Sequence, residues 1–124
     1  MTMNSDTNVT LGELKERIAA FAKARDWEQF HAPKNLAMAL ASEVGELMEH
    51  FLWSDNMESR QLLEDSSKRE QVAEELADVL IYALRFADVT GLDVTKAILA
   101  KMERNEERYP VEKAKGSSAK YNEL

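Results

Sequence analysis

The sequence predicts an all-α fold, a four-helix-bundle-like domain, and two observations support this class. Its 124 residues include only four glycines and two prolines, too few chain breakers for a turn-rich β fold. Apolar residues recur at helical spacing in segments flanked by helix start or stop signals. No segment is a strand candidate, so the predicted helices have only one another to pack against.

The first two predicted helices cover residues 10–26 and 33–53. Thr10, with Glu13 three residues later, forms a capping-box pattern that marks the start of the first helix. Pro33 suits the first turn of the second helix, because the N–H that proline lacks has no intrahelical partner there. The apolar side of the first helix is formed at helical spacing by Leu11, Leu14, Ile18 and Phe21.

The third predicted helix begins at Ser67, where Glu70 repeats the capping-box pattern, and ends at Gly91. Before it, residues 54–66 are predicted to form a loop with one short turn. The broad apolar face of this third helix is formed by Leu76, Val79, Leu80, Ala83, Leu84 and Ala87.

A fourth helix is predicted between Asp93, which can cap it, and Pro110, which stops it. The length of the chain fits a single domain, and we expect one all-α domain over residues 10–110. Residues 1–9 are predicted to be a disordered leader. The polar residues 111–124 are predicted to be a tail that can order over the active site.

The composition excludes several classes of function. A net charge of −7 gives no electrostatic affinity for DNA or RNA, and it also repels a free triphosphate unless divalent cations reverse the local field. The absence of cysteine excludes disulfides and thiolate metal sites. No apolar run approaches the roughly 20 residues of a membrane span, and no signal peptide is visible, so we expect no membrane partner and a cytoplasmic protein.

Two carboxylate pairs are the main candidates for chemistry. Glu43 and Glu46 lie three residues apart in the second helix, and Glu75 and Asp78 repeat the spacing in the third. Side chains at i and i+3 share one helix face, so each helix presents a pair. Facing pairs would supply up to eight oxygens, which suits Mg²⁺ or Mn²⁺.

The alternative to a metal site is a solvated acidic face, the commoner interpretation of any single pair. Here both pairs lie in apolar sequence, where crowded like charges are costly unless a cation neutralises them. A ferritin-like di-iron site would need two Glu-x-x-His motifs. His50 fails this test because Leu47 stands three residues before it, and Glu28 with His31 falls in a predicted loop without a second copy.

Aromatic residues near the carboxylates are candidates for stacking on a base. Trp53 lies seven residues after Glu46 and Tyr82 seven after Glu75, which returns each to the carboxylate face about 10 Å along the helix. Both can equally be core aromatics. In an antiparallel hairpin they point to opposite ends of the metal site, so one base would contact both only if the helices cross or a second subunit contributes.

Two further segments carry candidate substrate contacts. The connection before Pro33 is rich in aromatic and polar side chains, and its alternative role is a hydrophobic plug; its candidates are Trp27, Glu28, Gln29, Phe30 and His31. A polar and basic stripe on the fourth helix is either solvated or in contact with phosphates. Its residues are Lys101, Arg104, Asn105 and Arg108, with Lys120 and Tyr121 as further candidates in the tail.

Three segments make the chain resemble a known family. They are RDWEQFHAPKNLAMALASEVGELMEHFLW, EELADVLIYAL and KMERNEERYPVEKAKGSSAKYNEL, and the similarity covers about residues 11–124. They resemble the MazG-like all-α nucleotide pyrophosphohydrolases, in particular the dCTP pyrophosphatase branch. The resemblance implies hydrolysis between the α and β phosphates of a nucleoside triphosphate, nucleotide-pool house-cleaning, and homodimers or homotetramers with shared active sites.

The resemblance also implies roles for individual residues. Mg²⁺ would bind Glu43, Glu46, Glu75 and Asp78, and Trp27 to His31, Trp53 and Tyr82 would line the base pocket. Apart from the resemblance, our mechanistic hypothesis is that a carboxylate not saturated by metal, Glu43 or Glu46, acts as general base. The chain departs from the dCTP branch at Ile18, where that branch often carries histidine. Two alternatives remain: a non-enzymatic helical interaction protein whose acidic residues are surface charges, and a related enzyme that prefers dATP, dUTP or a modified nucleotide.

Overall fold

The computed structural model describes residues 3–124, and these divide into two compact units, the first ending at Gly91 and the second beginning at Leu92. The described residues contain helices and no strand, so the predicted all-α class is confirmed. No helix among them is both long enough and apolar enough to cross a membrane.

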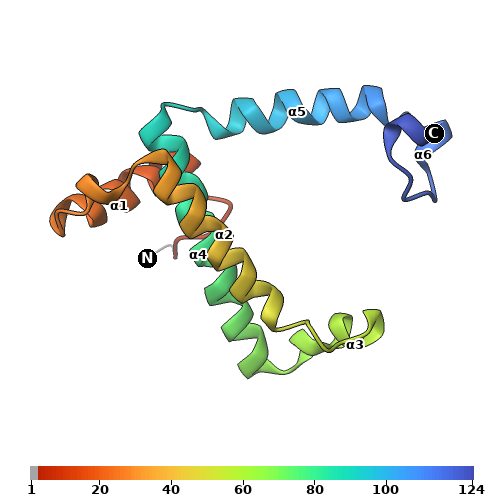
Figure 1. Cartoon of the computed structure of the whole chain (residues 1–124), viewed down its shortest axis with the longest axis horizontal. Helices are drawn as coiled ribbons and strands as arrows, with labels where there is room; N and C mark the ends of the chain where they lie inside the picture. The colour runs from red at the N-terminus through yellow and green to blue at the C-terminus, as the bar shows by residue number, and fades with distance from the viewer. Residues whose placement is uncertain (1–2) are drawn as a thin grey trace. The chain divides into compact units, whose positions relative to one another are not determined.

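The first unit is built on a helical hairpin. Its helices in chain order are α1 (Leu11–Ala24), η1 (Glu28–Phe30), α2 (Pro33–Glu49), α3 (Asn56–Gln61), η2 (Leu62–Glu64) and α4 (Ser66–Thr90). Helices α2 and α4 run antiparallel, side by side, and α1 packs against α4 (Figure 1). The buried apolar side chains are few: Ala22, Leu36, Val72, Leu84 and Ala87.

The start of α1 follows the predicted capping box. The Thr10 hydroxyl accepts from the Glu13 backbone N–H at 3.1 Å, and the Glu13 carboxylate accepts from the Thr10 N–H at 3.0 Å. At the other end the chain turns through Asp26, whose φ of 56° lies in the left-handed region that short polar side chains tolerate. This turn leads the chain from α1 into η1.

Helix α2 is shorter than predicted. Pro33 occupies its first turn as expected, but the helix ends at Glu49, so the predicted extension to residue 53 is wrong. Tight turns follow, in which the Phe51 N–H donates to the Met48 carbonyl at 2.9 Å. The sequence after the helix, HFLWSDN, is poor in strong helix formers and supplies a cap for the next helix, which explains the early end.

The connection between α2 and α4 is more helical than predicted. Asp55 caps α3 by accepting from the Glu58 N–H at 2.8 Å, so residues 54–66 contain α3 and η2 instead of a loop with one turn. Asp65, not Ser67, is the N-cap of α4; its carboxylate accepts from the Ser67 N–H at 3.2 Å. A carboxylate cap one residue before the helix takes the role assigned to the Ser67 hydroxyl.

Gly91 ends α4 with a φ of 71°, the left-handed conformation that glycine adopts without a Cβ penalty, as the sequence predicted. At the other end of the unit, residues 5–8 form a turn in which the Asn8 N–H donates to the Ser5 carbonyl at 3.2 Å. The part of the predicted leader at residues 1 and 2 lies outside the described residues.

The second unit contains α5 (Val94–Arg108), α6 (Val111–Ala114) and η3 (Tyr121–Glu123). Asp93 caps α5 as predicted, accepting from the Lys96 N–H at 2.9 Å, and the helix ends before Pro110. The segment after α5 folds back on its end, where the Tyr109 and Tyr121 rings meet edge-on at 6.2 Å. The single-domain interpretation of residues 10–110 stays a prediction.

Candidate metal centre and substrate site

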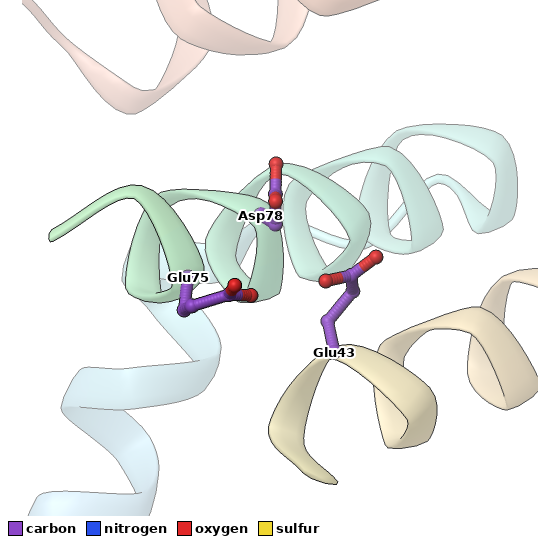
Figure 2. A group of neighbouring side chains, drawn as sticks. All are labelled: Glu43, Glu75 and Asp78. Atoms are coloured by element: carbon purple, nitrogen blue, oxygen red, sulfur yellow. The ribbon is translucent and has the colours of Figure 1, made fainter. Parts of the chain in front are cut away.

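Three carboxylates from the two hairpin helices meet at one point. Glu43 projects from α2, and Glu75 and Asp78 project from α4 (Figure 2). One oxygen of each lies within 4.8 Å of the others. The i,i+3 spacing places Glu75 and Asp78 on one face of α4, and the packing of α2 against that helix brings Glu43 to them. We call these three residues the acidic cluster.

Two oxygens of the acidic cluster are buried without a hydrogen-bond partner, Oε2 of Glu43 and Oε2 of Glu75. Buried polar groups are nearly always paired, because an unpaired one loses its hydration without compensation. The third carboxylate, Asp78, is exposed. The cluster is thus closed on the side of the helix interface and open to solvent at Asp78.

Glu46 is linked electrostatically to both buried members of the cluster. Side-chain hydrogen bonding with Glu46 raises the pKa of Glu43 from its ordinary 4.5 to about 7, with further contributions from burial and from repulsion by Asp78 and Glu75. Burial raises the pKa of Glu75, hydrogen bonding with Glu46 raises it further, and His50 acts in the opposite direction. All four predicted carboxylates therefore act on one another.

The donor set fits a hard divalent cation. All candidate ligand atoms are carboxylate oxygens, the donors preferred by Mg²⁺ and Mn²⁺, and two of them lack a partner that a cation would supply. The only Glu-x-x-His motif of the sequence ends at His31, whose Nδ1 accepts a hydrogen bond from Arg85 at 2.9 Å. That histidine is therefore engaged away from the acidic cluster, which weakens the di-iron interpretation further.

The predicted base-binding segment lies in and around η1. Trp27 packs edge-on against Phe21, with ring centroids 5.7 Å apart, and Gln29 donates to the Asp26 carbonyl at 3.0 Å. Glu28 and Phe30 are exposed. The segment thus packs on the end of α1, while its side chains stay accessible to solvent or a ligand.

The two predicted stacking residues lie in opposite directions from the acidic cluster. Tyr82 is half-buried on α4 and lies one turn beyond Asp78. Trp53 lies four residues beyond the end of α2 and is 94% exposed, so it does not share the helical face of Glu46 as predicted. Because α2 and α4 are antiparallel, one chain does not bring both rings to one base, as the spacing already indicated.

The predicted phosphate contacts belong to the second unit. Lys101 and Arg104 are exposed on α5, and Asn105 is partly exposed. The guanidinium of Arg108 lies over the Tyr121 ring, 4.6 Å from its centroid. A role for Lys101, Asn105 and Arg108 in phosphate binding, and for Lys120 and Tyr121 with them, stays a prediction.

Two residues near the site were missed at the level of sequence. Arg85 is 7% exposed and bonds His31 and Asp88, and His50 lies close enough to Glu75 to act on its pKa. A signal for Arg85 was present, since it is the single basic residue within the apolar run LIYALRFA of α4. No comparable signal exists for His50, because its position depends on how α2 packs on α4.

The fold and the acidic cluster define an all-helical protein with a candidate metal centre, and comparisons with known proteins give its family. The model of the MazG-like family matches residues 38–124, and the chain belongs to this family. It is 44% identical over 115 residues to dCTP pyrophosphatase 1 of Rattus norvegicus, covering 93% of this chain and 68% of that protein. The chain is 45% identical over 115 residues to the Homo sapiens protein of the same name, again covering 93% of this chain and 68% of that protein.

A solved structure is also similar. The crystal structure of a pyrophosphatase from Archaeoglobus fulgidus superposes with a TM-score of 0.76 at 37% sequence identity. The match covers 89% of this chain and 98% of that one. The helical architecture is therefore shared over nearly the whole length of both chains.

Proposed function

We propose that the protein is a Mg²⁺-dependent nucleoside triphosphate pyrophosphohydrolase. It cleaves dCTP or a related nucleotide between the α and β phosphates and releases the monophosphate and pyrophosphate. The observation that carries this proposal is the acidic cluster with two unpartnered buried oxygens, in a chain whose relatives are named dCTP pyrophosphatase. A cytoplasmic role in cleaning the nucleotide pool is part of the proposal.

Mg²⁺ would be held by Glu43, Glu75 and Asp78, with Glu46 beside them. When bound, the cation would polarise the phosphates and lower the pKa of a coordinated water. Glu43 and Glu46 are the residues placed to accept the proton of the attacking water, because Glu46 lies close enough to Glu43 to raise its pKa to about 7 in the metal-free site. The open side of the cluster at Asp78 is where the triphosphate would enter.

The base would be held by residues on the Tyr82 side of the acidic cluster, with the segment from Trp27 to His31 as the other wall. Phosphate charge not neutralised by Mg²⁺ would be met by Lys101, Asn105 and Arg108. These three residues form one polar face of α5, with spacings of four and three residues.

Preference for a base other than cytosine is a second candidate within the same activity. Ile18 lines an apolar cavity of about 470 Å³ between α1 and α4. Phe21 of α1 and Leu84 of α4 line the same cavity. An aliphatic side chain offers no hydrogen bond where the dCTP branch often carries histidine, which favours testing dATP, dUTP and modified nucleotides as well.

A second copy of the chain would complete the enzyme as a homodimer or homotetramer. Apolar side chains are half exposed on α1 and α4, including Phe21 and Leu80, while few are fully buried in the first unit. An apolar groove between α2 and α4, lined by Met48, Leu52 and Leu76 among others, offers more such surface. Burying this apolar surface against another copy would add hydrophobic stabilisation. A second copy would also be needed for Trp53 and Tyr82 to contact one base.

The test is turnover of a panel of canonical and modified triphosphates by the full-length protein, with and without Mg²⁺, followed by identification of the products. The proposal predicts monophosphate and pyrophosphate, dependent on Mg²⁺. A helical interaction protein without enzymatic activity predicts no turnover and no increase in melting temperature with Mg²⁺, and that pair of results would refute the proposal. Light scattering of the same sample gives the subunit count.

A further inference from the structure

Arg85 is buried in α4 and bonds two side chains, one of them outside its own helix. Its Nε donates to Nδ1 of His31 at 2.9 Å, and its Nη1 contacts the Asp88 carboxylate at 3.3 Å. A buried guanidinium is costly unless it is paired and hydrogen-bonded. Arg85 therefore ties the segment before α2 to α4 through a single imidazole nitrogen.

This hydrogen bond determines where the proton of His31 lies. Because the Arg85 Nε always carries hydrogen, Nδ1 of His31 must be the acceptor and carries none. A neutral imidazole then bears its one proton on Nε2. Burial and the positive charge of Arg85 both lower the pKa of His31, and Glu28 opposes them. Asp88 bonds the same guanidinium through Nη1 and is the other charged group in this contact.

The position of Arg85 relates His31 to the acidic cluster. Glu75, Asp78, Tyr82 and Arg85 follow one another at intervals of three, four and three residues, so they form one stripe along α4. Arg85 lies about 10 Å beyond Asp78 along the helix axis. That separation is comparable to the reach of a triphosphate to its base, so His31 is at the base end of the proposed substrate site.

We propose that Arg85 is a positioning residue that presents His31 as a neutral Nε2–H donor to an acceptor atom of the substrate base. The inference rests on the proposed function for the identity of the ligand. The matching chemistry is a base carbonyl oxygen or an unprotonated ring nitrogen. A cationic imidazole would instead favour phosphate, and Arg85 opposes that form.

The first experiment requires no substrate and no activity measurement. The chain has two histidines, so nitrogen NMR of the protein labelled in its imidazoles gives two sets of signals, and His31→Gln identifies those of His31. We expect an unprotonated Nδ1 and a protonated Nε2 in the full-length protein at pH 7, with a pKa below 6.5. A mixture of tautomers, or a charged ring at pH 7, would overturn the inference.

The second experiment measures kinetics of Arg85→Met with Arg69→Met as its control, an exposed arginine near the start of the same helix. Loss of one hydrogen bond predicts a rise in KM of roughly threefold to tenfold with little change in kcat, because the acidic cluster is untouched. The control should match the parent protein. His31→Gln keeps an uncharged N–H donor and should retain more affinity than His31→Ala.

The outcomes separate the two proposals. If no triphosphate is turned over, the proposed function fails, and the nitrogen spectra still decide whether Arg85 fixes the tautomer. If turnover is found but Arg85→Met folds and leaves both KM and the His31 spectrum unchanged, the positioning role is wrong. Should Arg85→Met not fold, the spectrum of the parent protein and the comparison of His31→Gln with His31→Ala still decide the matter.

Discussion

In the α2–α4 hairpin two buried carboxylate oxygens, on Glu43 and Glu75, lack a partner, whereas the buried guanidinium of Arg85 farther along α4 has two. Both regions place charge where water is scarce, and both are costly unless the charge is compensated. The Arg85 region compensates it within the chain. The acidic cluster does not compensate its charge within the chain. The Arg85 contact is thus already complete, whereas the acidic cluster needs a ligand.

The largest expected effect comes from neutralising one member of the acidic cluster. Glu75→Gln removes a metal-binding oxygen and should lower turnover by at least about 100-fold, because the charge that organises the transition state is lost. Pyrophosphate release at saturating Mg²⁺ is the measurement. Glu74→Gln, the same change at the neighbouring exposed carboxylate, is the control. Equal turnover of the two variants would refute the assignment of Glu75.

The next largest effect is expected from removing the Arg85 contacts with His31 and Asp88. Arg85→Met leaves the His31 nitrogen and the Asp88 carboxylate without their shared donor and should lower the free energy of unfolding by about 1–3 kcal/mol. Arg69→Met should change it by no more than about 0.5 kcal/mol, because Arg69 is exposed. Urea denaturation of the three proteins gives the comparison. If Arg85→Met lowered the free energy of unfolding no more than Arg69→Met, the buried contacts of Arg85 would not contribute to stability.

The smallest expected effect is a pH dependence of stability that arises from the acidic cluster and not from the Arg85 contacts. The pKa of Glu43 is near 7 in the folded protein against an ordinary 4.5, so its protonated form favours folding fully below about pH 4.5. That contribution is lost as pH rises through 7, and Glu75 shifts in the same direction. Without divalent cations, the melting temperature relative to that of Glu43→Gln should therefore fall between pH 5 and pH 8.

Added Mg²⁺ should remove most of this dependence in the parent protein and little of it in the variant, because the cation takes the place of the proton. The measurement is the difference in melting temperature between the two proteins across that pH range. A constant difference would contradict the coupling among Glu43, Glu46 and Glu75.

The sequence was most informative where the signal is local. The caps at Thr10 and Asp93, Pro33 in a first turn and Gly91 at a helix end each depend on residues within one turn, and all four were predicted. The errors lay where two local signals compete. Ser67 is a plausible cap, but the carboxylate of Asp65 caps α4 instead and accepts from the Ser67 N–H.

The residues of the acidic cluster were predictable because the i,i+3 spacing places each pair on one helix face. Only the packing of α2 against α4 had to be assumed. The contact of Arg85 with His31 was not predictable, since the residues lie 54 positions apart and meet through tertiary packing. The early end of α2 had a similar cause, because the Asp55 cap of α3 competes with a longer helix and carries Trp53 off the predicted face.

Calorimetric titration of the full-length protein with Mg²⁺, with Glu75→Gln and Glu74→Gln measured alongside, tests the central claim most directly. The acidic cluster predicts saturable binding to the parent protein and to Glu74→Gln, accompanied by proton release near pH 7, and strongly weakened binding to Glu75→Gln. Equal binding to all three proteins, or no binding to any, would contradict a cation site between α2 and α4.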